Sequence, residues 1–74
     1  MHVRIYLERR MILGYSSRSI IKKIEADGWY LVRVRGSHHQ FKNHIKQGLV
    51  TVPDPSRDLD PKTAKSILKQ AGLQ

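Results

Sequence analysis

The first clear pattern of apolar residues in the chain is helical and runs from residue 17 to 27. Ile20, Ile21 and Ile24 lie on one face of such a helix, and the charged residues between them lie off it. A serine at position 16 or 17 can cap the first turn, because its hydroxyl accepts a hydrogen bond from a free backbone amide. Gly28 tolerates the left-handed conformation that commonly ends a helix. The pattern predicts a helix over residues 17–27.

Three segments with the two-residue alternation of β-strands follow this helix. They cover residues 29–35, 38–43 and 49–52, and short turns separate them at 36–37 and 45–48. Short strands joined by tight turns favour an antiparallel meander. The alternation also predicts which side chains share a face of the sheet. In the first strand Tyr30, Val32 and Val34 are expected on one apolar face, with Leu31, Arg33 and Arg35 on the other; in the second, His38, Gln40 and Lys42 are expected opposite His39 and Phe41.

A second helical pattern closes the chain. Asp60 can cap this helix, and Pro61 suits its first position, where the missing amide costs nothing. Its apolar stripe consists of Ala64, Ile67, Leu68 and Ala71, and Gly72 ends it. The order of elements predicts an α+β fold: a small α-β-β-β-α domain, in which both helices cover one face of a three-stranded antiparallel sheet.

Length and composition limit the chain to one small domain. It has 74 residues and no cysteine, so neither disulfides nor thiolate metal sites can stabilise it. No apolar run approaches the roughly 20 residues of a membrane span, and we expect a cytoplasmic protein without a membrane partner. Residues 1–15 do not continue into the pattern that follows, so we divide the chain into an N-terminal extension, 1–15, and a domain, 16–74. The extension is expected to be disordered or a weak edge strand.

The charge of the chain points to an acidic partner. Fourteen Lys and Arg residues stand against six Asp and Glu residues, which gives a formal net charge of +8. The excess is concentrated in residues 17–48, which carry seven basic and two acidic residues. Such a surface attracts phosphate backbones and raises the rate of encounter with nucleic acid. RNA or DNA is therefore the first partner to consider.

Two adjacent histidines, His38 and His39, are the first candidates for chemistry. Adjacent side chains of a strand face opposite sides, so we expect one imidazole beside Phe41 and the other exposed beside Lys42 and the arginines. Neighbouring cations disfavour a charged imidazolium, which leaves the exposed histidine able to accept a proton. It could act as a general base on a ribose 2′-hydroxyl while cations stabilise the phosphorane. A packing or phosphate-binding role is the alternative.

Two further interpretations of these residues depend on how the chain folds. A metal site made of His38, His39, His44 and either Asp54 or Asp58 is conceivable, but the spacing matches no ligand signature and the local charge repels a dication. No metal or other cofactor is therefore expected. Basic residues on the helices form a track for an RNA backbone if the fold brings them beside Arg33, Arg35 and Lys42; these are Arg18, Lys22, Lys23 and Lys69. For each of them taken singly, a solvated helix face is the simpler interpretation.

Several motifs together resemble a known family. They are Ser17 to Lys22, Asp27-Gly28-Trp29, the Gly-Ser-His-His-Gln-Phe-Lys segment 36–42, Val-Thr-Val-Pro at 50–53 and Ser-Ile-Leu-Lys-Gln-Ala-Gly-Leu at 66–73. From about residue 16 to 73 the chain resembles the HicA toxins of bacterial toxin–antitoxin systems. The pairing of Gly-Ser-His-His with the closing Ile-Leu-Lys-Gln-Ala-Gly-Leu is specific.

The resemblance implies a fold similar to a double-stranded-RNA-binding domain and a toxin of a type II toxin–antitoxin system. Such a toxin is a metal-independent endoribonuclease that cleaves mRNA without the ribosome, and a HicB-like antitoxin covers its active site. The family's essential histidine falls on His38, with His39 in reserve, and the preceding glycine falls on Gly36. The RNA-binding residues would then be Gly36 and Ser37 of the turn together with Arg33, Arg35, Lys42, Lys22, Lys23 and Lys69.

One position departs from the family pattern. The family commonly has histidine after the Val-Pro that ends the third strand, and this chain has Asp54 there. If that position helps to bind RNA or the antitoxin, an acid there would weaken the contact. The alternative function is a non-catalytic RNA-binding module of the same fold, in which the cations act only as clamps. Cleavage of RNA by a homogeneous preparation separates the two.

Overall fold

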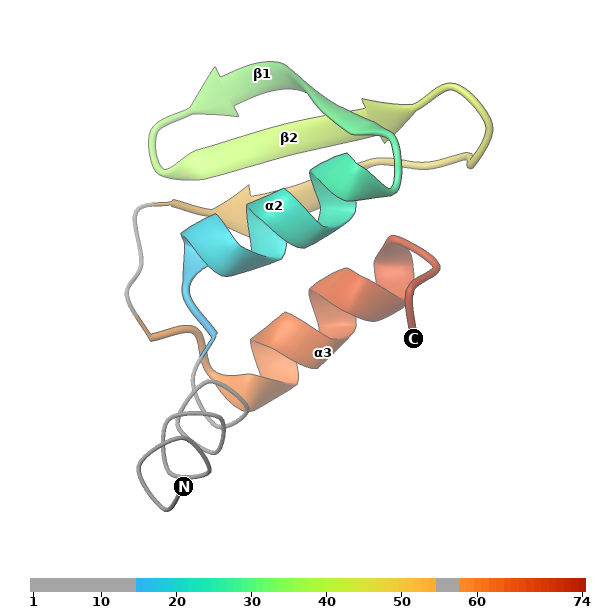
Figure 1. The fold of residues 1–74 in the computed structure, drawn as a ribbon. Helices are drawn as coiled ribbons and strands as arrows, with labels where there is room; N and C mark the ends of the chain where they lie inside the picture. Colours follow the sequence, from blue (N-terminus) through green and yellow to red (C-terminus); the bar gives the residue numbers. More distant parts are fainter. Residues whose placement is uncertain (1–14, 55–57) are drawn as a thin grey trace.

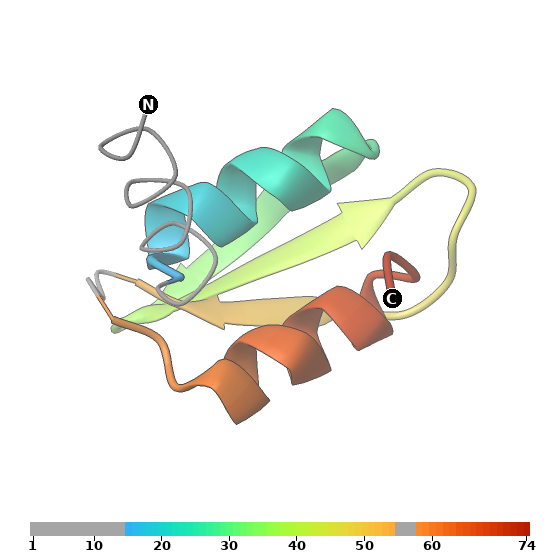
Figure 2. The same ribbon diagram turned by 60° about the horizontal axis from the view of Figure 1, so that its bottom comes forward.

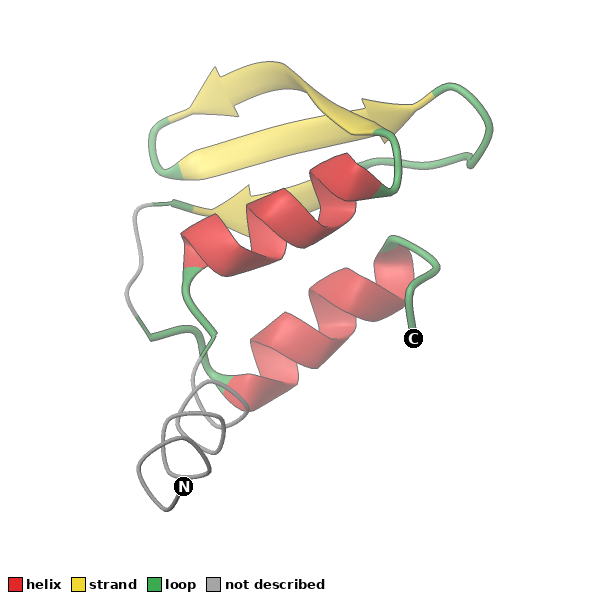
Figure 3. Cartoon of the chain, in the orientation of Figure 1, coloured by secondary structure: helices red, strands yellow, loops and turns green. Residues whose placement is uncertain are grey.

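The predicted order of helix, three strands and helix is present in the protein. The computed structural model describes residues 15–54 and 58–74, and Figures 1 and 3 display its elements. With the labels of Figure 1 these are α2 (Ser17–Ala26), β1 (Trp29–Arg35), β2 (His38–Asn43), β3 (Val50–Pro53) and α3 (Pro61–Gln70). The extension predicted over residues 1–15 lies, except for Tyr15, outside the described residues. Tyr15 itself forms an isolated bridge with Leu59.

The α+β architecture predicted from the sequence is confirmed. The sheet is antiparallel with the order β1-β2-β3. Both helices cover the same face of the sheet, which Figure 2 makes clear by bringing the helices forward. Between the layers lies one core, to which every element contributes; its members include Ile20, Ile24, Trp29, Phe41, Val50, Val52, Leu59, Ile67 and Leu68. The opposite face of the sheet has no cover from the described residues.

Local hydrogen bonds explain where the helices begin. Ser16 caps α2: its Oγ accepts from the amide of Ser19 at 3.1 Å, and the Ser19 hydroxyl accepts from the amide of Ser16 at 3.1 Å. Asp60 caps α3 by accepting from the amide of Lys62 at 3.0 Å. Ser17 is fully buried, and its hydroxyl donates to the carbonyl of Pro53. This bond ties the start of α2 to the end of β3.

The predicted faces of β1 are wrong, and a β-bulge is the reason. The register with β2 shifts between Leu31 and Arg33, so Val32 is an extra residue in the pairing. Before the shift Tyr30 is opposite Lys42, and after it Val34 is opposite His39. Since directly paired residues share a face, Tyr30 and Val34 lie on opposite faces. Of the seven residues of β1 only Trp29 is buried, so Tyr30 is not part of the core.

β3 also begins one residue later than predicted. Leu49 precedes the strand and is 43% exposed, whereas Val50 and Val52 are fully buried. The alternation of the strand places these two valines in the core and turns Thr51 outward. The third predicted strand is therefore confirmed as an element and displaced at its boundaries.

A lysine in the loop between β2 and β3 joins three parts of the chain. The Lys46 ammonium donates to Oδ2 of Asp27 at 2.6 Å, to the carbonyl of Ala71 at 3.0 Å and to that of Gly72 at 3.4 Å. Asp27 is the C-cap of α2, and the two carbonyls lie at the end of α3. This arrangement, the Lys46 clamp, holds both helix ends to the loop, so Lys46 has a structural role.

Over the part of the chain that the structure describes, no helix has both the length and the apolar character needed to cross a membrane.

Candidate functional site

The β1–β2 hairpin brings the predicted arginines and His38 onto one side of the sheet. Arg35 is paired with His38, Arg33 with Gln40, and Tyr30 with Lys42. These pairs lie on the face that the helices do not cover, because β2 alternates and turns Phe41 into the core. We call this the outer face; it comprises Tyr30, Arg33, Arg35, His38, Gln40 and Lys42. Three of the RNA-binding residues predicted from the sequence, Arg33, Arg35 and Lys42, therefore accompany His38.

The turn at Gly36 and Ser37 sets the position of His38. Gly36 has a φ of 57°, in the left-handed region that favours glycine, and no atom lies within 4 Å of the place where a Cβ would stand. The carbonyl of Ser37 accepts from the amide of Asp54 at 2.6 Å, which extends the β2–β3 pairing to the turn. The first residue of β2 is thus held on both sides while its imidazole stays exposed.

His39 occupies the other face of the sheet, as the strand alternation predicts. It is paired with Val52, on the side where Phe41 is buried, and its side chain is 22% exposed. Its Nε2 lies 3.5 Å from Oδ2 of Asp54. Its Nδ1 is buried and has no hydrogen-bond partner among residues 15–54 and 58–74. The division between an exposed and a packed histidine is confirmed.

Of the residues considered for a metal site, the structure brings His39 and Asp54 together but does not assemble a group of three. His38 and His39 lie on opposite faces, and His44 stacks on Tyr30 with ring centroids 4.7 Å apart and an interplanar angle of 26°. That stack is at the other end of β2 from the Gly36 turn. Among the described residues no group of three or more His, Asp or Glu side chains is arranged to hold a metal ion.

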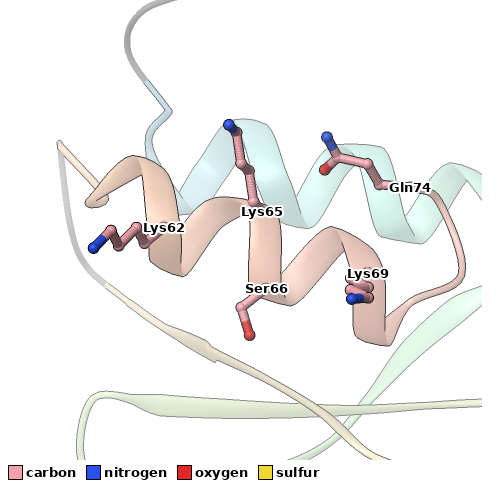
Figure 4. A pocket seen from close by; sticks show the side chains of 5 residues that line it. All are labelled: Lys62, Lys65, Ser66, Lys69 and Gln74. Carbon is pink, nitrogen blue, oxygen red and sulfur yellow. The ribbon is translucent and has the colours of Figure 1, made fainter.

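The lysines predicted on the helices are separate from the outer face. Lys22 and Lys23 are exposed on α2 and Lys69 on α3, in the layer on the other side of the sheet. Their predicted role in binding RNA stays a prediction. Lys69 belongs to an open hollow of about 620 Å³ that also involves Lys62, Lys65, Ser66 and Gln74 (Figure 4). The sequence reasoning missed Lys62 and Lys65, although their spacing from Lys69 places all three on one side of a helix.

Comparison with known proteins agrees with this geometry. The family model described as the HicA toxin of bacterial toxin–antitoxin systems matches residues 17–73. A solved toxin–antitoxin complex from Streptococcus pneumoniae contains a chain with a TM-score of 0.67 and 29% sequence identity, and the match covers 78% of the present chain and 97% of that one. No curated protein matches. Since the family model spans most of the chain, from the first residue of α2 to three residues beyond α3, the protein belongs to the HicA family of bacterial toxins.

Proposed function

We propose that this toxin is an endoribonuclease that cleaves cytoplasmic mRNA without a metal ion, and that His38 is its general acid–base. The observation that carries the proposal is the exposed imidazole of His38 opposite Arg35, on the same face as Arg33 and Lys42. A titratable group beside several fixed cations suits phosphoryl transfer at RNA, in which a proton moves and negative charge develops on the phosphate. Membership of a toxin family supports the same conclusion.

The mechanism needs only the 2′-hydroxyl of the substrate as nucleophile. His38 takes the 2′-hydroxyl proton as the 2′-oxygen attacks the adjacent phosphorus. The bond from phosphorus to the 5′-oxygen of the next nucleotide then breaks, that oxygen takes a proton from solvent water, and the His38 imidazolium returns its proton to solvent. The products are a 2′,3′-cyclic phosphate and a 5′-hydroxyl. In this proposal Arg35, paired with His38, stabilises the phosphorane, and Arg33 and Lys42 hold the backbone farther along β2.

His39 is the reserve candidate, and two observations favour His38 over it. The Nε2 of His39 already faces the carboxylate of Asp54, and its Nδ1 is buried. An RNA strand on the outer face would meet His38 first. The carboxylate of Asp54, the acid that departs from the family pattern, lies 3.5 Å from Nε2 of His39, which is on the opposite face of the sheet from His38. We therefore expect that Asp54 does not abolish activity.

An antitoxin is the protein partner that we propose. The S. pneumoniae relative was solved as a toxin–antitoxin complex, which supports a HicB-like antitoxin for this toxin. Such a protein would cover the surface around His38 with acidic side chains that complement the cations of the outer face. The exposed apolar side chains of β1 on this face, Tyr30 and Val32, would add contact area. Association should be fast and weaken as salt is raised.

Three histidine variants test the catalytic assignment. End-labelled single-stranded RNA is incubated in EDTA with the wild type, His38→Ala, His39→Ala and a control, His44→Ala, whose ring stacks on Tyr30 away from the turn. We expect cleavage by the wild type and the control and a loss of at least about 100-fold with His38→Ala, the lower range of general acid–base catalysis. Retained cleavage by His38→Ala with loss in a folded His39→Ala transfers the role to His39. RNA binding without cleavage by the wild type would instead support the non-catalytic module.

A further inference from the structure

The outer face contains a hollow around Gln40, two residues along β2 from His38, and the proposed mechanism gives Gln40 no role. Its volume is about 320 Å³, and its walls are Val32, Arg33, Gln40, Lys42 and Leu49. This volume is at the lower end of the range for sites that bind small organic groups. The walls combine two apolar side chains, each 43% exposed, with one amide and two cations. We call it the Gln40 pocket.

The β-bulge builds one wall of this pocket. Because Val32 is the extra residue, Val32 and Arg33 together oppose Gln40, and an apolar side chain stands next to a guanidinium. Leu49 approaches from the loop that leads into β3. An exposed valine and leucine at a concave site favour a ligand with an apolar face. A nucleobase has such faces, and an arginine plane can also stack on one.

The distance along β2 suits a nucleotide next to the cleaved bond. Gln40 is two residues from His38 and two from Lys42, and all three share the outer face. Successive residues of a strand rise by about 3.4 Å, so His38 and Gln40 are roughly 7 Å apart along the strand. That is close to the length of one nucleotide in an extended single strand. A strand with its reacting phosphate at His38 therefore carries a neighbouring base to the pocket.

The amide of Gln40 is the group that can distinguish bases. Within the described ranges the Gln40 side chain makes no hydrogen bond to the protein, and the residue is half-buried. A primary amide presents an acceptor and a donor side by side. Adenine offers the complementary donor at N6 and acceptor at N7, and glutamine commonly recognises adenine by hydrogen bonds to both. Unstacked bases of single-stranded RNA expose that edge.

We propose that the Gln40 pocket holds one nucleobase of the RNA adjacent to the cleaved phosphate, and that Gln40 selects adenine there. The inference rests on the proposed ribonuclease function and adds to it the residue that determines sequence preference. Val32 and Leu49 contact the faces of the base, Gln40 bonds its edge, and Arg33 and Lys42 neutralise the flanking phosphates. Gln40 takes no part in proton transfer, so its replacement alters where RNA is cut more than whether it is cut.

The test is a cleavage-site profile on RNA with a randomised window. The wild type, Gln40→Ala, Gln40→Glu and a matched control, Gln70→Ala on the exposed side of α3, each cut the pool, and the product ends are sequenced. We expect the wild type and the control to favour adenine at one fixed position next to the cut. Gln40→Ala should lower that preference by at least about fivefold, the smaller effect of losing a bidentate base contact. Gln40→Glu, which keeps the shape of the side chain, should shift the preference towards cytosine, whose amino group donates to a carboxylate.

The result can separate failure of this inference from failure of the proposed function. If the wild type cuts RNA and neither Gln40 variant changes the profile at any position, the inference is overturned and the ribonuclease stands. If the wild type cuts no RNA, the ribonuclease proposal fails, and RNA-binding measurements then test whether the Gln40 pocket holds a base. Fluorescence anisotropy of His38→Ala with short adenine-rich and uridine-rich RNAs is then compared with His38→Ala/Gln40→Ala. If the double variant binds the adenine-rich RNA more weakly than His38→Ala does, but binds the uridine-rich RNA equally well, the pocket is supported. If the two affinities are unchanged, or change by the same factor, the inference is overturned.

Discussion

The separation of the cations into two surfaces predicts how salt will affect RNA binding. Arg33, Arg35 and Lys42 lie on the outer face with His38, whereas the lysines of α3 lie in the helix layer. If a single strand follows β2, only the first set releases counterions when RNA binds. Changing Arg33, Arg35 and Lys42 together to glutamine should then alter the salt dependence. The same change at Lys62, Lys65 and Lys69, a matched loss of three charges, should not.

The size of the effect follows from the number of phosphate contacts. Each neutralised phosphate of a single strand contributes about 0.7 to the slope of log affinity against log salt. Removing three contacts therefore makes the slope shallower by about 2. When the salt concentration is raised fourfold, the wild type should lose affinity by a factor about 16 times larger than the factor lost by the outer-face variant. The α3 variant keeps all three outer-face contacts, so its slope should stay within about 0.5 of the wild type.

Both triple variants are made on His38→Ala, so that RNA stays intact, and circular dichroism confirms that each is folded. Anisotropy titrations with an unstructured, labelled RNA at several salt concentrations give the slopes. A fall of about 2 for the outer-face variant and none for the α3 variant agrees with a strand on β2. The opposite pattern would place the RNA on the helix layer and refute the assignment of the outer face, and equal falls would show that RNA contacts both surfaces.

Two further predictions concern the parts of the fold that hold the site, and both are measured by chemical denaturation. Lys46→Met removes the Lys46 clamp and should lower the free energy of unfolding by about 1–2 kcal/mol; the loss is smaller than for a fully buried ion pair because the lysine side chain is 36% exposed. The control Lys65→Met, at an exposed position, should change the free energy of unfolding by less than about 0.5 kcal/mol. Equal effects of the two variants would contradict a structural role for the clamp. Gly36→Ala should cost about 1–2 kcal/mol because of its φ of 57° alone, since a Cβ meets no atom there, while Gly36→Asn should cost less. An alanine variant as stable as the wild type would contradict that reasoning.

Local chemistry explains why the elements could be predicted from the sequence. Ser16 and Asp60 cap the two helices by bonds to residues two or three positions away, and Pro61 and the apolar stripes add signals within a single turn. The placement of His38 and His39 on opposite faces was predictable for the same reason. β2 is regular, so the alternation of its side chains follows from its own sequence without knowledge of the strands beside it. These features depend on neighbours in the chain.

The features that could not be predicted depend on contacts between distant parts of the chain. The bulge at Val32 exists only in the pairing with β2, and it puts Tyr30 and Val34 on opposite faces of the sheet, with Tyr30 outside the core. The Lys46 clamp joins residues 27, 46 and 72, which no periodicity connects. The separation of Lys69 from the outer face likewise follows from the packing of α3 on one side of the sheet. The sequence showed which cations are present, and the fold determined which of them accompany His38.

The most direct test of the central claim replaces one hydroxyl of the substrate. Once the cut position in a short RNA is known, the same RNA is made with a single 2′-deoxy nucleotide on the 5′ side of that bond, and both strands are incubated with the toxin in EDTA. Attack by the 2′-oxygen with His38 as acid–base predicts cleavage of the all-ribose strand to a 2′,3′-cyclic phosphate and a 5′-hydroxyl, with the substituted bond intact. Cleavage of the 2′-deoxy bond, or a product with a 5′-phosphate, would contradict it.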